Sequence, residues 1–136
     1  MKKTAFALLV LFLAVACGGS AGSHTPQDAI DAFLAAGLEA ESPTSMGAED
    51  YGLAPFVGEG VRFLIPSLGE DSGGRVFAVG EADDRERLAT YYESLGEQSA
   101  AFFSWVFVKD NLVLQLNGSL EEDVARQYEA ALNDLD

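Results

Sequence analysis

The chain has 136 residues, of which 49% are hydrophobic, so it is long enough for one folded domain and too apolar to be disordered. Its 22 acidic residues outnumber its eight basic ones, which gives a formal net charge of −14. Loss of a leader that contains Lys2 and Lys3 would leave six basic residues and change the charge to −16. This charge disfavours binding to nucleic acid and to anionic lipid headgroups, because both require a basic surface.

Residues 1–16 predict a signal peptide. Two lysines precede an apolar run that is too short to span a bilayer. The run ends in AVAC, which resembles the lipobox of bacterial lipoproteins, although leucine is commoner where Ala14 stands. The resemblance implies cleavage before Cys17, the one cysteine of the chain, and a diacylglycerol on its sulfur. The letters AVA would also suit an ordinary signal peptidase.

Residues 17–24 are rich in glycine and serine and predict a flexible tether that begins at the lipidated Cys17. We therefore expect an exported protein, anchored to the bacterial membrane through this lipid and facing the periplasm or the cell exterior.

Residues 25–136 are expected to form a single domain. Thr25 and Pro26 begin a helix whose apolar stripe runs to Gly37. Residues 41–60 have no clear period and predict a long connection with room for a short helix or a binding role. The next elements, in chain order, are strands at 61–66 and 74–80 and a helix at 82–96 that ends at Gly96.

The sequence FFSWVFVKDNLVLQLNG (102–118) gives the clearest signal, a β-hairpin that turns at Asp110-Asn111. This turn predicts Trp105 opposite Leu116 on a core face and leaves the other face partly wet. Ser119 and Glu122 predict a capping box at the start of a last helix.

The order α-β-β-α-β-β-α predicts the α+β class: an antiparallel four-stranded sheet with helices packed on one face.

The loop sequence Asp71-Ser72-Gly73-Gly74 has the letters found around the nucleophilic serine of chymotrypsin-like proteases. A serine nucleophile needs a nearby base. The single histidine, His24, lies in the expected tether, and Lys109 belongs to the hairpin turn. We therefore expect a turn and no catalytic residue. Residues Glu70, Asp71, Ser72, Gly73 and Gly74 remain a candidate loop for a ligand or partner, since turn backbones can bind ions.

A second group of polar residues, Glu81, Asp83, Asp84 and Glu86, offers oxygen ligands but lacks the spacing of a calcium loop. These acids also suit a helix N-terminus. No metal and no cofactor is expected.

Three segments of the expected domain, RFLIPSLGEDSGGRVF (62–77), LATYYESLGEQSAAFFSWVFVKDN (88–111) and LQLNGSLEEDVARQYEAAL (114–132), resemble a group of small bacterial lipoproteins and secreted proteins, some labelled stress proteins. The resemblance implies no activity, substrate or catalytic residue. We expect a non-catalytic binding or structural module whose partner is an envelope protein or a small ligand. The alternatives are an envelope hydrolase that uses carboxylates and a small inhibitor or immunity lipoprotein.

Overall fold

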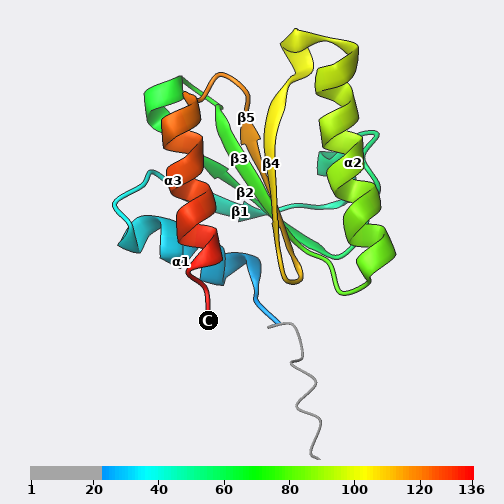
Figure 1. The fold of residues 1–136 in the computed structure, drawn as a ribbon, viewed down its shortest axis with the longest axis horizontal. Coiled ribbons are helices and arrows are strands. Elements are labelled where there is room, and N and C mark those ends of the chain that lie inside the picture. The colour runs from blue at the N-terminus through cyan, green and yellow to red at the C-terminus, as the bar shows by residue number, and fades with distance from the viewer. Residues whose placement is uncertain (1–22) are drawn as a thin grey trace, which may run out of the picture.

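The computed structural model describes residues 23–136 as an α+β structure with three α-helices and a five-stranded antiparallel sheet (Figure 1). The strand order is β1-β2-β3-β5-β4. The helices and strands are α1 (Pro26–Ala35), β1 (Glu41–Ser45), β2 (Glu59–Leu64), β3 (Gly73–Ala78), α2 (Ala82–Gln98), β4 (Ser104–Lys109), β5 (Leu112–Asn117) and α3 (Glu122–Asn133). The predicted signal peptide and Cys17 lie outside the described residues.

The expectation of four strands was wrong, because residues 41–45 form the edge strand β1 within the segment expected to be a connection. Thr44 pairs with Arg62 and Ser45 with Val61 of β2, and the register shifts between Glu41 and Thr44. All five β1 residues are exposed. The strand therefore has no buried face, and its sequence shows no alternation of apolar and polar residues. Backbone pairing with β2 is what makes it a strand.

The rest of that segment contains a short 3₁₀ helix, η1 (Ala48–Tyr51). The sequence had left room for a short helix in this connection.

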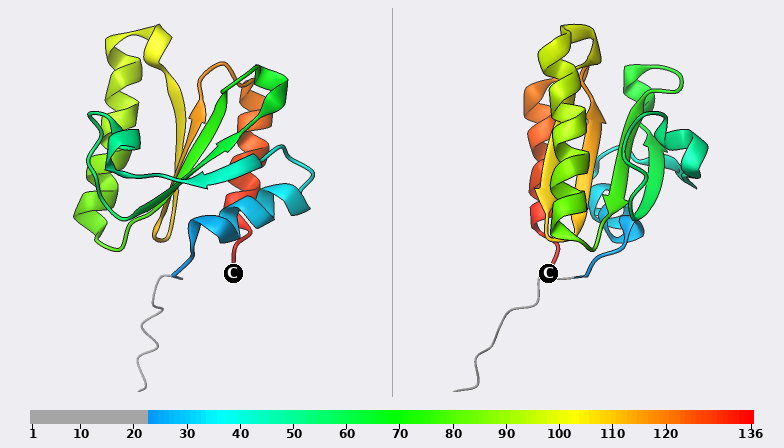
Figure 2. Two further views of the ribbon diagram at one scale, coloured as in Figure 1. Left: turned by 180° about the vertical axis from the view of Figure 1, so that it is seen from behind. Right: turned by 90° about the vertical axis from the view of Figure 1, so that its right-hand side faces the viewer.

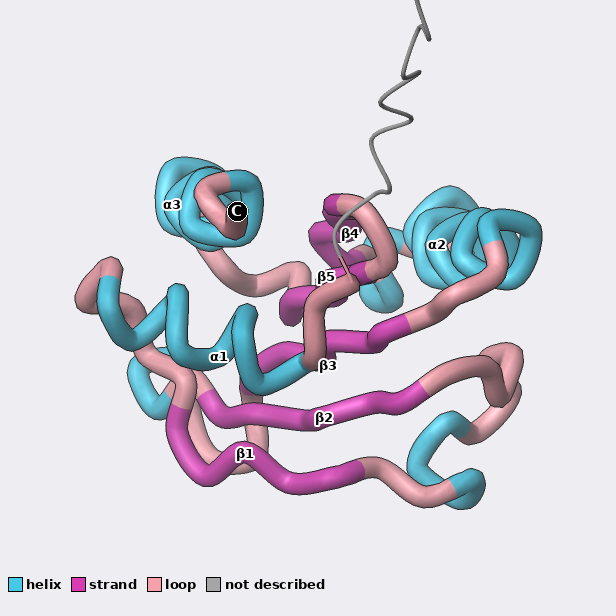
Figure 3. The backbone as a smooth tube through the Cα atoms, turned by 90° about the horizontal axis from the view of Figure 1, so that it is seen from below, coloured by secondary structure: helices cyan, strands magenta, loops and turns pink. Residues whose placement is uncertain are grey.

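The helices cover both faces of the sheet, and the expectation of one face was wrong. On one side α1 and α3 pack over Phe63, Val76 and Leu114. On the other side α2 and the segment around Tyr51 cover Phe77 and Val113. Figure 3 shows β4 and β5 lying between α3 and α2. The sheet is strongly twisted, so that β4 and β5 run across the direction of β1 (Figures 1 and 2).

Both ends of α1 follow the predicted signals. Thr25 and Asp28 form a capping box: the Asp28 amide donates to the Thr25 hydroxyl over 3.2 Å and the Thr25 amide to the Asp28 carboxylate over 2.7 Å. At the other end Gly37 has a φ of +77°, and the Leu38 amide donates to the Phe33 carbonyl. This is a Schellman ending, which favours glycine.

The other two helices each have one end at a different residue from the one predicted. Helix α2 continues through Gly96, where the ring of Phe103 lies so close that a Cβ would contact it at 3.2 Å. Helix α3 begins at Glu122 with Glu121 as its N-cap, so Ser119 does not form the expected capping box.

The hairpin of β4 and β5 has the predicted register, with Trp105 opposite Leu116. Asp110 in its turn has a φ of +50°. Trp105 is only partly buried. Its indole nitrogen donates to the Leu120 carbonyl over 2.9 Å, and the guanidinium of Arg126 lies 5.9 Å from the ring centre.

Candidate ligand-binding site

The sheet face that carries α2 is apolar at one end and polar at the other. Side chains alternate along each strand, so on β3 Arg75 shares this face with Phe77, and on β5 Gln115 shares it with Val113. Helix α2 covers the apolar end. The polar end forms a hollow of about 130 Å³, lined by Arg62, Asp71, Gly73, Gly74, Arg75, Gln115 and Asn117.

Arg62 and Arg75 occupy directly opposite positions on β2 and β3. Like charges in opposite positions of a strand pair destabilise a sheet. The Arg62 Nη2 atom donates to the carbonyl oxygen of Asp71 over 2.7 Å and lies 4.0 Å from the Asp71 carboxylate. That carboxylate is 91% exposed, so water screens its attraction to the arginine.

Arg75 is held by neutral groups. Its Nη1 atom donates to Gln115 Oε1 over 2.9 Å, and Gln115 Nε2 donates to the Ser104 hydroxyl over 2.8 Å. Gln115 is a polar side chain that is only 5% exposed. This chain of hydrogen bonds crosses β3, β5 and β4 and fixes the direction of the Arg75 side chain.

The candidate loop contributes part of this hollow. Asp71, Gly73 and Gly74 line it, whereas Glu70 and Ser72 do not. The Ser72 carbonyl accepts a hydrogen bond from the Ile65 amide over 2.8 Å, as a turn requires. His24 lies against the hairpin turn, at the opposite end of the sheet from Ser72.

Sequence reasoning missed the two arginines and Gln115. Each is a polar residue with apolar neighbours on both sides or a glycine beside it, and no motif in the sequence singles it out. The alternation of side chains in β3 and β5 could have placed Arg75 and Gln115 on one face, but only with the register between these two non-consecutive strands.

In the acidic group at the start of α2, Asp84 pairs with Arg87 at 3.3 Å, and Asp83 and Asp84 lie in the first turn of the helix. Glu81 is the N-cap residue, but its side chain makes no capping hydrogen bond. Within residues 23–136, no group of three or more His, Cys, Asp or Glu side chains is arranged to hold a metal ion.

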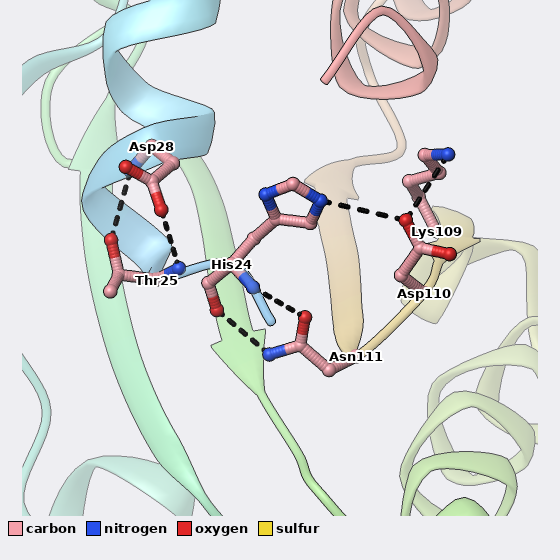
Figure 4. Close-up of polar contacts among 6 residues, drawn as sticks. All are labelled: His24, Thr25, Asp28, Lys109, Asp110 and Asn111. Atoms are coloured by element: carbon pink, nitrogen blue, oxygen red, sulfur yellow. Dashed lines mark hydrogen bonds and ion pairs between the residues drawn. The ribbon is translucent and has the colours of Figure 1, made fainter. Parts of the chain in front are cut away.

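A second polar cluster joins the start of the folded body to the hairpin turn (Figure 4). The His24 amide donates to Asn111 Oδ1 over 2.8 Å, and Asn111 Nδ2 donates to the His24 carbonyl over 2.7 Å. The His24 ring lies 3.5 Å from Asp110, which also pairs with Lys109 at 3.1 Å. We call the two bonds between His24 and Asn111 the Asn111 clamp. His24, expected in the flexible tether, is therefore held in place.

The clamp supports the helix cap beside it. Thr25 follows His24 directly, and the hydrogen bond from its backbone lowers the pKa of the Asp28 carboxyl group. The cluster thus fixes where α1 begins, and the Asn111 side chain and the His24 backbone already bind one another. The arginine hollow is the better candidate for a ligand, because its Arg75 forms no ion pair with a described carboxylate and the Asp71 carboxylate beside Arg62 is 91% exposed.

Comparison with known proteins found no matching family model, no matching curated protein and no matching solved structure. In the part of the chain that the structure describes, no helix is both long and apolar enough to span a membrane.

Proposed function

We propose that the protein is an exported, lipid-anchored module of the bacterial cell envelope that binds a ligand and catalyses no reaction. The leader and the AVAC sequence support the anchor at Cys17. The arginine hollow supports the binding role, since it combines two cations with neutral hydrogen-bonding groups and only one carboxylate, that of Asp71.

The observation that carries the proposal is the position of the hollow relative to the start of the domain. The clamp ties His24 to the hairpin turn, where β5 begins, whereas Asn117 in the hollow ends β5. Six residues of strand span about 17 Å. Figure 1 shows the chain entering at the bottom and the connection between β2 and β3 at the top. A domain anchored through residues 17–23 would present the hollow away from the membrane.

Binding is favoured over hydrolysis because of the groups present. Glycoside hydrolysis with carboxylates commonly requires a pair of them. Asp71 is the one carboxylate among the residues that line the hollow.

The lipid anchor is tested by the substitution Cys17→Ser. We expect the natural protein to partition into detergent and its N-terminal peptide to carry the mass of diacylglycerol. The substitution should leave an uncleaved precursor or a soluble exported form. One acyl chain binds membranes with an association constant of only roughly 10⁴ M⁻¹, whereas two chains hold a protein stably.

The serine variant should melt at the same temperature as the natural protein, because the substitution leaves residues 25–136, the expected domain, unchanged. An unmodified Cys17 thiol on a natural protein found wholly in the aqueous phase would disprove the anchor.

A further inference from the structure

We infer that the hollow between Arg62 and Arg75 binds the oxyanion group of a small molecule, a carboxylate or a phosphate. The inference names a ligand class for the binding role proposed above and rests on that role. It does not depend on the lipid at Cys17.

The first argument is the distribution of positive charge. Six basic residues follow the leader in a chain with 22 acidic ones, yet two of the six lie directly opposite each other. The pair opposes folding by mutual repulsion. A bound anion between the guanidinium groups would turn this repulsion into attraction.

The second argument is the set of unused donors on Arg75. A guanidinium group carries five N–H donors, and among the described residues Arg75 makes one side-chain hydrogen bond, to Gln115. It forms no ion pair with a described carboxylate, in contrast to Arg62, Arg87, Lys109 and Arg126. Arg75 is also partly buried, so its charge is less screened by water than that of an exposed arginine.

The third argument is that the arginine is oriented before a ligand arrives. Gln115 is buried and is fixed by Ser104, so one edge of the Arg75 guanidinium is anchored and the other donors are left for a ligand. Arginine in this arrangement suits an anion with two or more oxygens, because its parallel N–H groups match their spacing.

The size of the hollow restricts the ligand. A volume of about 130 Å³ accommodates a carboxylate or phosphate group with some water. It is smaller than the pockets of roughly 300–1,000 Å³ that enclose whole drug-sized molecules. The remainder of a larger ligand would lie outside, over the exposed loop that contains Asp71.

The experiment is a titration of the whole chain, purified in detergent and labelled with ¹⁵N. The probes are inorganic phosphate, succinate and, at matched ionic strength, sodium chloride. We expect saturable shifts of the Gly73 and Gly74 amides and of the Gln115 side-chain amide with phosphate, succinate or both. Saturation with phosphate alone would assign a phosphate group, and saturation with succinate alone a carboxylate.

Three variants and a control locate the site. Arg62→Gln and Arg75→Gln should each weaken binding roughly tenfold or more, since each removes charge-assisted hydrogen bonds. Gln115→Glu keeps the shape of the side chain but gives Arg75 an internal ion pair, so it should abolish the ligand-induced shifts of the Gly73 and Gly74 amides. This variant keeps both arginines, so it tests the site even if an arginine variant fails to fold. Arg87→Gln changes the net charge equally, at a side chain that is 63% exposed, and should bind as the natural protein does.

The inference fails if chloride gives the same shifts as the two oxyanions, or if no probe gives saturable shifts. It also fails if Arg87→Gln weakens binding as much as Arg75→Gln. Anion binding by a protein whose Cys17 is unmodified would leave this inference standing and refute only the anchor.

Discussion

Ser72 and Gly73 are neighbours at the start of β3, but they differ in how well their positions tolerate substitution. The Ser72 hydroxyl makes no hydrogen bond with any residue in the described range 23–136, so Ser72→Ala should change the free energy of unfolding by less than about 0.5 kcal/mol. A Cβ on Gly73 would overlap the carbonyl oxygen of Phe63, which is backbone and cannot swing away. Gly73→Ala should therefore cost about 1–3 kcal/mol. Urea denaturation of both variants measures the difference.

This pair of substitutions also separates a turn from a nucleophile. Covalent labelling of Ser72 by a fluorophosphonate would contradict the turn assignment, as would a large loss of stability in Ser72→Ala.

Tyr128 links α3 to the residue that precedes β1 by two positions. Its hydroxyl donates to the Glu39 carbonyl over 2.6 Å, and the side chain is 1% exposed. Burial, together with the charge of Glu39, raises the pKa of Tyr128 to about 12. An unfolded tyrosine has a pKa near 10. The folded state therefore holds this proton more tightly, and stability is full below pH 10 and falls as the pH rises toward 12.

Tyr128→Phe should lower the free energy of unfolding by about 1 kcal/mol at pH 8 and reduce its decline above pH 10. Urea denaturation between pH 8 and pH 11 tests both effects. Burial also raises the pKa values of Tyr51 and Tyr92, so the variant should keep part of the alkaline decline. An unchanged pH profile would contradict the role assigned to Tyr128.

At the scale of elements, the Asn111 clamp connects α1 to the hairpin, which lies 87 residues away in sequence. Asn111→Ala removes both hydrogen bonds to His24 and should cost about 1–2 kcal/mol. The His24 and Thr25 amides should exchange with solvent faster, while amides in the middle of β5 keep their protection. Hydrogen exchange followed by mass spectrometry provides the measurement.

Asn111→Asp is the second variant for the clamp. It keeps the acceptor for the His24 amide but replaces the donor to the His24 carbonyl with an oxygen that repels it. It should therefore also speed exchange of the His24 amide relative to the natural protein. Equal exchange at His24 in all three proteins would show that the clamp does not hold this segment.

The elements that could be predicted from sequence are those whose signals lie within a few residues. The Thr25 cap and the Gly37 ending define α1, and the Asp110-Asn111 turn fixes the register of the hairpin. Strand β1 could not be predicted, because its residues are exposed and its pairing depends on β2. The second apolar face of the sheet could have been predicted, because consecutive apolar residues such as Leu112-Val113-Leu114 place apolar side chains on both faces of a strand.

The candidate site was less accessible to prediction than the fold. Arg62 and Arg75 meet only because an eight-residue connection sets the register between β2 and β3, and its composition does not determine that register. The loop at 70–74 was identified, but for its turn residues and not for the two arginines beside it. Side chains that converge from three strands become visible only with the tertiary structure.

At the scale of the whole molecule, charge and apolar surface are divided between different regions. The two helical layers bury the apolar residues on both sides of the sheet. The acidic residues are mostly exposed, so the molecule repels anions at long range. If the hollow binds an oxyanion as inferred above, it should therefore select compact anions over long polyanions.

His24 and Asp136 line the same groove, so both ends of the folded body lie side by side, far from the hollow. A fluorescent protein or affinity tag fused after Asp136 would therefore emerge beside His24 and leave the opposite end of the sheet unobstructed. The same adjacency makes the domain a good substrate for circular permutation, because a short linker could join the two ends. If the proposed tether and lipid were moved to new ends opened in the exposed connection near Glu70, the end of the sheet that carries the arginine pair would face the bilayer, the reverse of the proposed natural orientation.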